Sequence, residues 1–215
     1  MLVIAAMAQT RSSQLEVVSS ALDTNSHAIN VSLVNRSGKK IVAYVIYVRQ
    51  LDGSGKPTGM PLTVGTDNVF SLVYGQNAPA SSFISPGEEI KKQFELLPDA
   101  VSANASVVAV VYQDRTAEGD PKQISLLFKN RAMHAQRAQE AADFLAEYPT
   151  SSSEARSRLS KLTLIRERTG AVEQLLHGNG IPNGNGIPNK EQWNAAAAEQ
   201  KALANLLTTQ SKVAE

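Results

Sequence analysis

Apolar and polar residues alternate along roughly the first half of the chain. Ile29, Val31 and Leu33, for example, alternate with polar residues. A period of two is typical of β-strands, because successive side chains point to opposite faces of a sheet. The pattern predicts six strands, near residues 14–21, 28–35, 40–50, 67–74, 88–96 and 106–113.

Turn-forming residues separate these predicted strands. Glycine, proline, serine and aspartate gather at residues 37–39, 52–57 and 85–87. Such residues favour turns because of their backbone freedom, their fixed φ or their side-chain bonds to the backbone. Short strands with no helical run between them favour two antiparallel sheets packed face to face over a parallel sheet. The first half of the chain is therefore predicted to be an antiparallel β-sandwich.

Two of the predicted strands are apolar on both faces. Residues 41–48 and 107–112 carry apolar side chains at odd and even positions alike. Both faces of each strand should therefore be covered, one of them by the opposite sheet. We expect the helical segment that follows Tyr112, or a second copy of the chain in a homo-oligomer, to cover the other face.

Helix signals begin at residue 120. Asp120 is a suitable N-cap, and Pro121 suits the first helical position. An apolar stripe with many small residues then continues to about Glu147, and Pro149 ends it. The sequence therefore predicts a first helix from Pro121 to about Glu147.

One or two more helices follow. Ser151 and Glu154 form a capping box for a second helix, which is predicted to continue to Leu176. Residues 178–189 are two copies of Gly-Asn-Gly-Ile-Pro-Asn, a composition typical of a flexible linker. A last, alanine-rich helix is expected at 190–212. The predicted fold class is therefore α+β, an antiparallel sandwich followed by two or three C-terminal α-helices.

The N-terminus resembles the end of a signal peptide. Residues 2–6 are apolar, and Ala6-Met7-Ala8 has the small-x-small form that signal peptidase cleaves, here after Ala8. A complete signal peptide would also have a basic region and a longer apolar stretch before this site. Both would be missing here if the start codon had been placed too late. The expected location is thus the periplasm, envelope or extracellular space, with the cytoplasm as the alternative. No apolar run is long enough to predict a transmembrane helix.

These observations divide the chain into five predicted segments. They are a signal-peptide-like segment at 1–8, a sandwich at 9–118, a helical hairpin packed on the sandwich at 119–177, a linker at 178–189 and a C-terminal helix at 190–215.

Composition removes several function classes. The chain has no cysteine, which excludes disulfides, thiolate metal sites and a cysteine nucleophile. Its formal net charge is only +1, so no basic surface calls for nucleic acid. Its three histidines lack the spacing of metal ligands, and no Gly-x-Ser-x-Gly motif is present. We therefore expect no catalytic residues and no cofactor.

Asp114, Glu118 and Asp120 cluster in one loop and are the candidate metal ligands. Their hard oxygen atoms suit calcium, but their spacing departs from that of an EF-hand, and Asp120 is already expected to cap a helix. We expect no metal site here. A metal-assisted hydrolase that uses these residues is accordingly the third candidate function, ranked after the two described below.

Two further groups of residues are candidate binding surfaces. A pocket between sheet and helices would be lined by four aromatic residues, Tyr44, Tyr47, Tyr112 and Phe128. It would make the protein a ligand-binding protein, which is the second alternative. The second predicted helix is locally basic through Arg156, Arg158, Lys161, Arg166 and Arg168. These cations would meet an anionic lipid surface, a cell-wall polymer or an acidic partner, or simply face solvent.

One stretch of the sandwich resembles a known class of modules. Residues 31–44 read Val-Ser-Leu-Val-Asn-Arg-Ser-Gly-Lys-Lys-Ile-Val-Ala-Tyr, and Asp52-Gly53 and residues 85–88, Ser-Pro-Gly-Glu, come later. This is similar to the strand, Asn-x-Ser turn, strand pattern of uncharacterised bacterial exported immunoglobulin-like modules. The resemblance covers residues 14–113 and implies an immunoglobulin-like sandwich of the envelope or extracellular space, with no active site to carry over.

In an immunoglobulin-like order, the strands at 41–48 and 107–112 would be the third and the penultimate, which are neighbours in one sheet. Asn-x-Ser sequons, which carry glycans only in a glycosylating secretory host, begin at Asn30, Asn35 and Asn104.

The function expected from these features is that of a non-enzymatic, exported interaction protein of the cell envelope. Its sandwich would be the scaffold, and its loops or helices would contact a protein partner whose identity the sequence does not give.

Overall fold

The computed structural model describes residues 14–69, 83–177 and 189–214. Within these ranges the chain forms seven strands and four helices, an α+β fold. The strands are β1 (Leu15–Asp23), β2 (Ala28–Asn35), β3 (Ile41–Leu51), β4 (Leu62–Asp67), β5 (Glu89–Glu95), β6 (Ser102–Tyr112) and β7 (Ala117–Gly119). The helices are α2 (Pro121–Leu145), α3 (Ser152–Leu162), α4 (Gly170–His177) and α5 (Lys190–Gln210).

The chain divides into two compact units. The sheet unit is Met1–Leu127 with Ala214–Glu215, and the helical unit is Phe128–Val213. The boundary falls inside α2, whose first turns belong to the sheet unit. None of the described helices is long and apolar enough to span a membrane.

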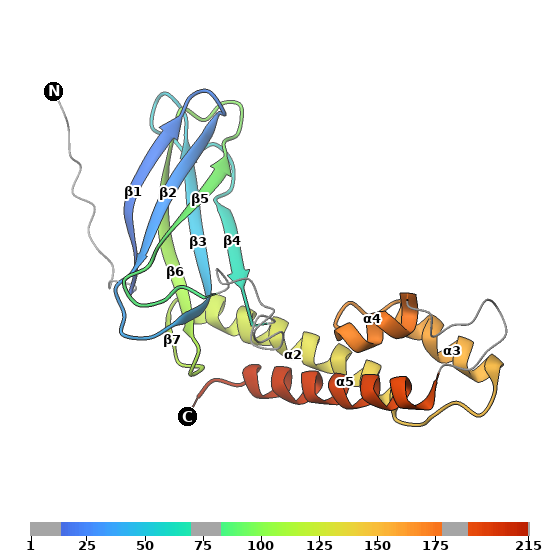
Figure 1. The fold of residues 1–215 in the computed structure, drawn as a ribbon. Coiled ribbons are helices and arrows are strands. Elements are labelled where there is room, and N and C mark those ends of the chain that lie inside the picture. The colour runs from blue at the N-terminus through green and yellow to red at the C-terminus, as the bar shows by residue number, and fades with distance from the viewer. Residues whose placement is uncertain (1–13, 70–82, 178–188, 215) are drawn as a thin grey trace. The chain divides into compact units, whose positions relative to one another are not determined.

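Two antiparallel sheets form the sheet unit, in the orders β1-β2-β5 and β4-β3-β6-β7 (Figure 1). Their facing sides enclose one apolar core, to which the first sheet contributes Leu33 and Phe94 and the second Tyr44 and Val110. The alternation along β2 explains this packing, since every second residue faces the core. The predicted antiparallel pairing is thus confirmed.

The third and the penultimate strands pair, as expected. β3 and β6 are matched from Ile41↔Tyr112 to Leu51↔Ser102, with two register shifts. Both faces of β3 are buried: Tyr44 is 2% exposed in the core, and Val45, on the opposite face, is 3% exposed. On that opposite face, the Gln123 side chain of α2 donates a hydrogen bond to the Tyr47 hydroxyl (3.0 Å). The expectation that this face is covered is therefore confirmed.

Two strands differ from the sequence-based expectation. A strand was not expected at Leu62–Asp67, where β4 lies, and residues 70–74 of the strand expected at 67–74 lie outside the described residues. Gly65 interrupts the alternation there and hides the strand. The three-residue strand β7 was not predicted, because it is too short to show a period.

Asn35 closes the turn between β2 and β3. Its side chain is fully buried, and it accepts hydrogen bonds from the Ser37 backbone N–H (2.9 Å) and hydroxyl (2.6 Å). Its amide donates to the carbonyls of Lys39 (2.9 Å) and Ile84 (2.8 Å). One side chain thus shapes the turn and ties it to the segment before β5.

The first helix forms as predicted, and the second does not. Asp120 caps α2 by accepting a hydrogen bond from the Lys122 backbone N–H (2.8 Å). The predicted helix from 151 to 176 is two helices, so the described part of the chain contains four helices rather than the two or three expected. Thr169 begins α4, because its hydroxyl accepts from the Val172 backbone N–H (3.3 Å).

A half-buried arginine, Arg168, stabilises this break. The Arg168 guanidinium donates to the carbonyls of Leu162 (3.0 Å), Thr163 (3.0 Å) and Ile165 (2.6 Å), where α3 ends. It also pairs with Glu173 of α4 at 2.7 Å. The carbonyls that a helix end leaves unpaired are therefore satisfied without a glycine or proline.

The helical unit has its own core. Trp193 of α5 is fully buried in it, and the indole N–H donates to the Leu145 carbonyl (3.2 Å). Gln200, also fully buried, donates to the carbonyls of Ala138 (3.3 Å) and Glu167 (2.6 Å) and accepts from the Thr169 N–H (3.0 Å). α5 is thus joined to α2 and to the start of α4.

Candidate interaction groove

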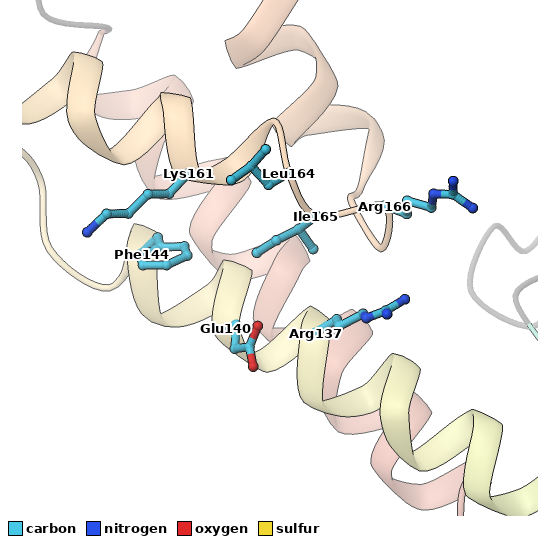
Figure 2. Close-up of a pocket in the computed structure, with 7 residues that line it drawn as sticks. All are labelled: Arg137, Glu140, Phe144, Lys161, Leu164, Ile165 and Arg166. Carbon is cyan, nitrogen blue, oxygen red and sulfur yellow. The ribbon is translucent and has the colours of Figure 1, made fainter.

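A groove of about 620 Å³ lies on the surface of the helical unit (Figure 2). Residues of α2, of α3 and of the α3–α4 connection line it: Arg137, Glu140, Phe144, Lys161, Leu164, Ile165 and Arg166. We refer to this hollow and its seven residues as the groove.

Helical spacing and the break after α3 create the groove. Arg137, Glu140 and Phe144 are separated by three and four positions, which places them on one side of α2. The chain leaves helical geometry after Leu162 and brings Leu164 to the same hollow. A continuous helix through 151–176 would not have formed this wall.

The apolar part of the groove is recessed, with one projecting side chain. Phe144 is half-buried, and Ile165 is only 7% exposed. Leu164, by contrast, is 84% exposed. A large apolar side chain left in water beside a recessed apolar surface is the kind of feature that partners bury.

Cations stand at both ends of the groove. Figure 2 shows Arg137 and Arg166 extending to the same side, while Lys161 extends the opposite way, past the Phe144 ring. The Lys161 ammonium lies 5.4 Å from the centre of that ring. Among the described residues, neither Lys161 nor Arg166 has a carboxylate within ion-pairing distance. With Glu140 as the single carboxylate of the lining, the groove is net positive.

Arg137 lies near a buried carboxylate. Its Nη1 lies 3.6 Å from Glu167 Oε1, the oxygen that His134 Nδ1 contacts at 2.6 Å. Glu167 is nearly fully buried, whereas the Arg137 side chain is 44% exposed. The guanidinium thus approaches Glu167 and also lines the groove.

A second hollow of about 420 Å³ adjoins the groove and shares Phe144 and Lys161 with it. Asp143 and Glu147 give it an acidic side. Of its two cations, Lys161 and Arg158, the latter is already paired with Glu154 (2.6 Å) and lies 3.6 Å from Glu147. The lining charge is thus positive in the groove and balanced in this second hollow.

The five cations that the sequence predicts for one basic surface lie in different surroundings in the structure. Lys161 and Arg166 line the groove. Arg158 and Arg168 are bound within the helical unit, where Arg158 donates to the carbonyls of Phe144 and Glu147, both at 3.0 Å. Arg156 is exposed on α3 outside the groove lining. Sequence reasoning missed Arg137, because no local pattern indicates which face of α2 approaches α3.

The structure also separates the aromatic residues of the expected ligand pocket. Tyr44 and Tyr112 are buried in the core between the sheets, whereas Tyr47 lies on the other face of β3. Burial, with the negative charge of Glu118 adding to it, raises the pKa of the Tyr112 phenol well above its usual range. Phe128 is buried in the helical unit, with the Arg131 guanidinium 5.2 Å from its ring centre.

The candidate metal ligands have other partners. Asp114 pairs with the Lys39 ammonium (2.7 Å) and accepts from the Thr116 hydroxyl (2.6 Å), and Asp120 caps α2. Glu118 lies on β7, opposite Val110. Within the described ranges, no group of three or more histidine, aspartate or glutamate residues could hold a metal ion.

These contacts predict a small loss of stability in acid. Hydrogen bonds from Lys39 and Thr116 lower the pKa of Asp114 to about 2. Because this value is below that of an unfolded aspartate, the contribution is present above pH about 4 and is lost as the pH falls toward 2. It should amount to at most about 1 kcal/mol, since both side chains of the pair are half exposed.

Urea unfolding between pH 2 and 7 measures this contribution. The variant Asp114→Asn should show a shallower decline below pH about 4 than the unchanged protein. Asp99→Asn, which removes the same charge at an exposed position, is the control. Parallel pH profiles for Asp114→Asn and the unchanged protein would contradict the assignment.

The chain has little similarity in sequence or structure to the known proteins with which it was compared. No protein-family model matches it, and no curated protein matches it. Among solved structures, it is similar to a hypothetical protein from Peptoclostridium difficile 630 whose X-ray structure was determined at 1.85 Å. The identity is 15%, the match covers 55% of this chain and 92% of that chain, and the TM-score is 0.38. A similarity of this extent supports no conclusion about function, which has to come from the residues of the chain itself.

Proposed function

We propose that this protein is a non-enzymatic interaction protein that binds a partner protein through the groove of its helical unit. The observation that carries the proposal is Leu164, which is 84% exposed beside the recessed Phe144 and Ile165. Burying such a side chain in a complex is favourable by the hydrophobic effect. Energetically important interface contacts are commonly an apolar anchor surrounded by polar residues.

The chemistry of the groove supports binding rather than catalysis. Its lining consists of two arginines, a lysine, a glutamate and three apolar residues. A hydrolytic or transfer reaction needs a nucleophile or a general base within hydrogen-bonding reach of a partner group. The cations and apolar residues of the groove are instead suited to recognition.

The scaffold of this protein, in our proposal, is an immunoglobulin-like sandwich. If the seven strands are named A, B, C, C′, E, F and G in chain order, the two sheets become A-B-E and C′-C-F-G. That order agrees with the arrangement of immunoglobulin-like domains, in which C, F and G share a sheet. The proposal also rests on the residue pattern from Val31 to Tyr44.

We also propose that the protein is exported to the cell envelope, where it meets its partner. The support is the Ala6-Met7-Ala8 sequence. Fractionation of the native host, followed by mass spectrometry of the mature N-terminus, tests this. A chain that begins at Gln9 outside the cytoplasm is expected, and an intact Met1 in the cytosol would contradict export.

Photo-crosslinking at the groove tests the proposed binding function. A benzoylphenylalanine at position 164 should crosslink one discrete protein in the native host, whereas the same group at the exposed Lys201 of α5 should not. Leu164→Ser should unfold with a free energy within about 0.5 kcal/mol of the unchanged protein, because position 164 is mostly in water. Absence of any crosslink specific to position 164 would overturn the function.

A further inference from the structure

We infer that the occupant of the groove is a short acidic segment of the partner, with an apolar side chain held between carboxylates. This inference rests on the proposed function and specifies the chemistry of the partner. The apolar side chain would contact Phe144, Ile165 and Leu164. The carboxylates would face Arg137 and Arg166 at one end and Lys161 at the other.

The positive charge of the groove is the reason to expect an acidic segment. Three cations and one carboxylate line the groove. Lys161 and Arg166 have no carboxylate partner among the described residues, so an incoming carboxylate would not have to displace an internal ion pair. Complementary charges favour the right partner and speed its approach, while like charges repel the wrong one.

Arginine geometry adds specificity at one end. Arg137 and Arg166 extend to the same side in Figure 2. The guanidinium fork matches the two oxygens of a carboxylate, which an ammonium group does not. Arg137 also lies 3.6 Å from the buried Glu167, and 44% of its side chain stays exposed to a partner.

The shape of the apolar surface favours a protein segment over a membrane. Ile165 is 7% exposed and lies at the bottom of a hollow, where a flat bilayer surface would not reach it. A side chain projecting from a partner protein can enter this space, whose volume is within the range of small binding sites.

Labelled peptides of defined composition test the inference with the full-length protein. The probes are three fluorescein-labelled octapeptides with alternating Asp and Leu, Lys and Leu, and Asp and Ser residues. In fluorescence anisotropy titrations, the Asp-Leu peptide should bind at least tenfold more tightly than either of the others. Binding should weaken as salt is added, because exposed charges are screened.

Charge-reversal variants assign this binding to the groove. Arg166→Glu and Lys161→Glu should each weaken binding of the Asp-Leu peptide about tenfold. Arg166→Glu should at the same time strengthen binding of the Lys-Leu peptide. Lys129→Glu is the matched control, since Lys129 is an exposed residue of α2 outside the groove, and it should change either affinity less than twofold.

Three results would overturn the inference. They are equal affinity for the acidic and basic peptides, no detectable binding of the Asp-Leu peptide at millimolar concentration, or losses for Lys129→Glu as large as those for Arg166→Glu. Sedimentation with phosphatidylglycerol–phosphatidylcholine vesicles gives a fourth. Vesicle binding that Lys161→Glu removes, without peptide binding, would mean that a membrane is the occupant.

The crosslinking experiment distinguishes this failure from failure of the proposed function. A discrete crosslink at position 164 to a segment without acidic residues would leave the binding function standing and refute the acidic occupant. A crosslinked segment that carries Asp or Glu beside an apolar residue is the expected result.

Discussion

Replacing Gly119 with alanine is expected to lower the free energy of unfolding of the sheet unit by about 3 kcal/mol or more. Gly119 ends β7 with a φ of 113°, a conformation that L side chains rarely adopt. A Cβ there would clash with the Val108 carbonyl oxygen and lie 2.9 Å from the Ala109 Cα. Both contacts are with backbone, which cannot move aside as a flexible side chain can.

The clash falls where the sheet leads into α2. The Val108 carbonyl also accepts a hydrogen bond from the Asp120 backbone N–H (2.7 Å). Separating β7 from β6 would therefore break this bond and disturb the N-cap of the helix. Loss of the sheet unit's cooperative transition would be the most severe form of the expected result.

Urea denaturation followed by far-ultraviolet circular dichroism measures the effect. Gly53→Ala is the matched control, because a Cβ at Gly53 has no atom within 4 Å and its φ is not positive. That change should alter the free energy of unfolding by less than about 1 kcal/mol. A Gly119→Ala variant as stable as Gly53→Ala would show that β7 does not pack against β6 as described.

Replacing Trp193 with alanine is expected to destabilise the helical unit by about 3–5 kcal/mol. The side chain is fully buried near the start of α5, where Tyr148 meets its ring edge-on at 6.3 Å. Alanine would leave a large cavity in the core and an unpaired carbonyl at Leu145. Because α5 is rich in alanine, few other large side chains are available to hold it.

Trp193→Phe distinguishes the contribution of the ring from that of the hydrogen bond. Phenylalanine keeps an aromatic ring but cannot donate to the Leu145 carbonyl, so we expect a loss of about 1–3 kcal/mol. Thermal and urea unfolding by circular dichroism measure both variants. Equal stability of Trp193→Ala and the unchanged protein would mean that α5 is not part of this core.

The sandwich could be predicted because its signals are local. Alternation at Ile29, Val31 and Leu33 reports directly which side chains face the core, and the two-faced strands identify the centre of a sheet. β4 was not predicted, because Gly65 interrupts its alternation. The order of strands in each sheet depends on pairings between distant residues, which no local pattern contains.

The groove could be predicted only in part, because contacts between distant residues create it. The basic character of the segment after Ser151 was visible in the sequence. The sequence did not show that Arg168 would satisfy the end of α3, and its continuing apolar period suggested one helix. The break depends on Arg168, on Glu173 and on the amide of Gln200, which is 31 residues from Thr169.

The buried side chain of Asn35 makes folding and glycosylation mutually exclusive at that sequon. Both protons of its amide are already donated to the carbonyls of Lys39 and Ile84, and its surface is inaccessible in the folded chain. An oligosaccharyltransferase could therefore modify Asn35 only before the turn closes, and the glycan would then block closure. In a glycosylating expression host, Asn30 and Asn104, which are exposed, would remain acceptors after folding. A sugar on Asn35 would mark the molecules that were modified before they folded.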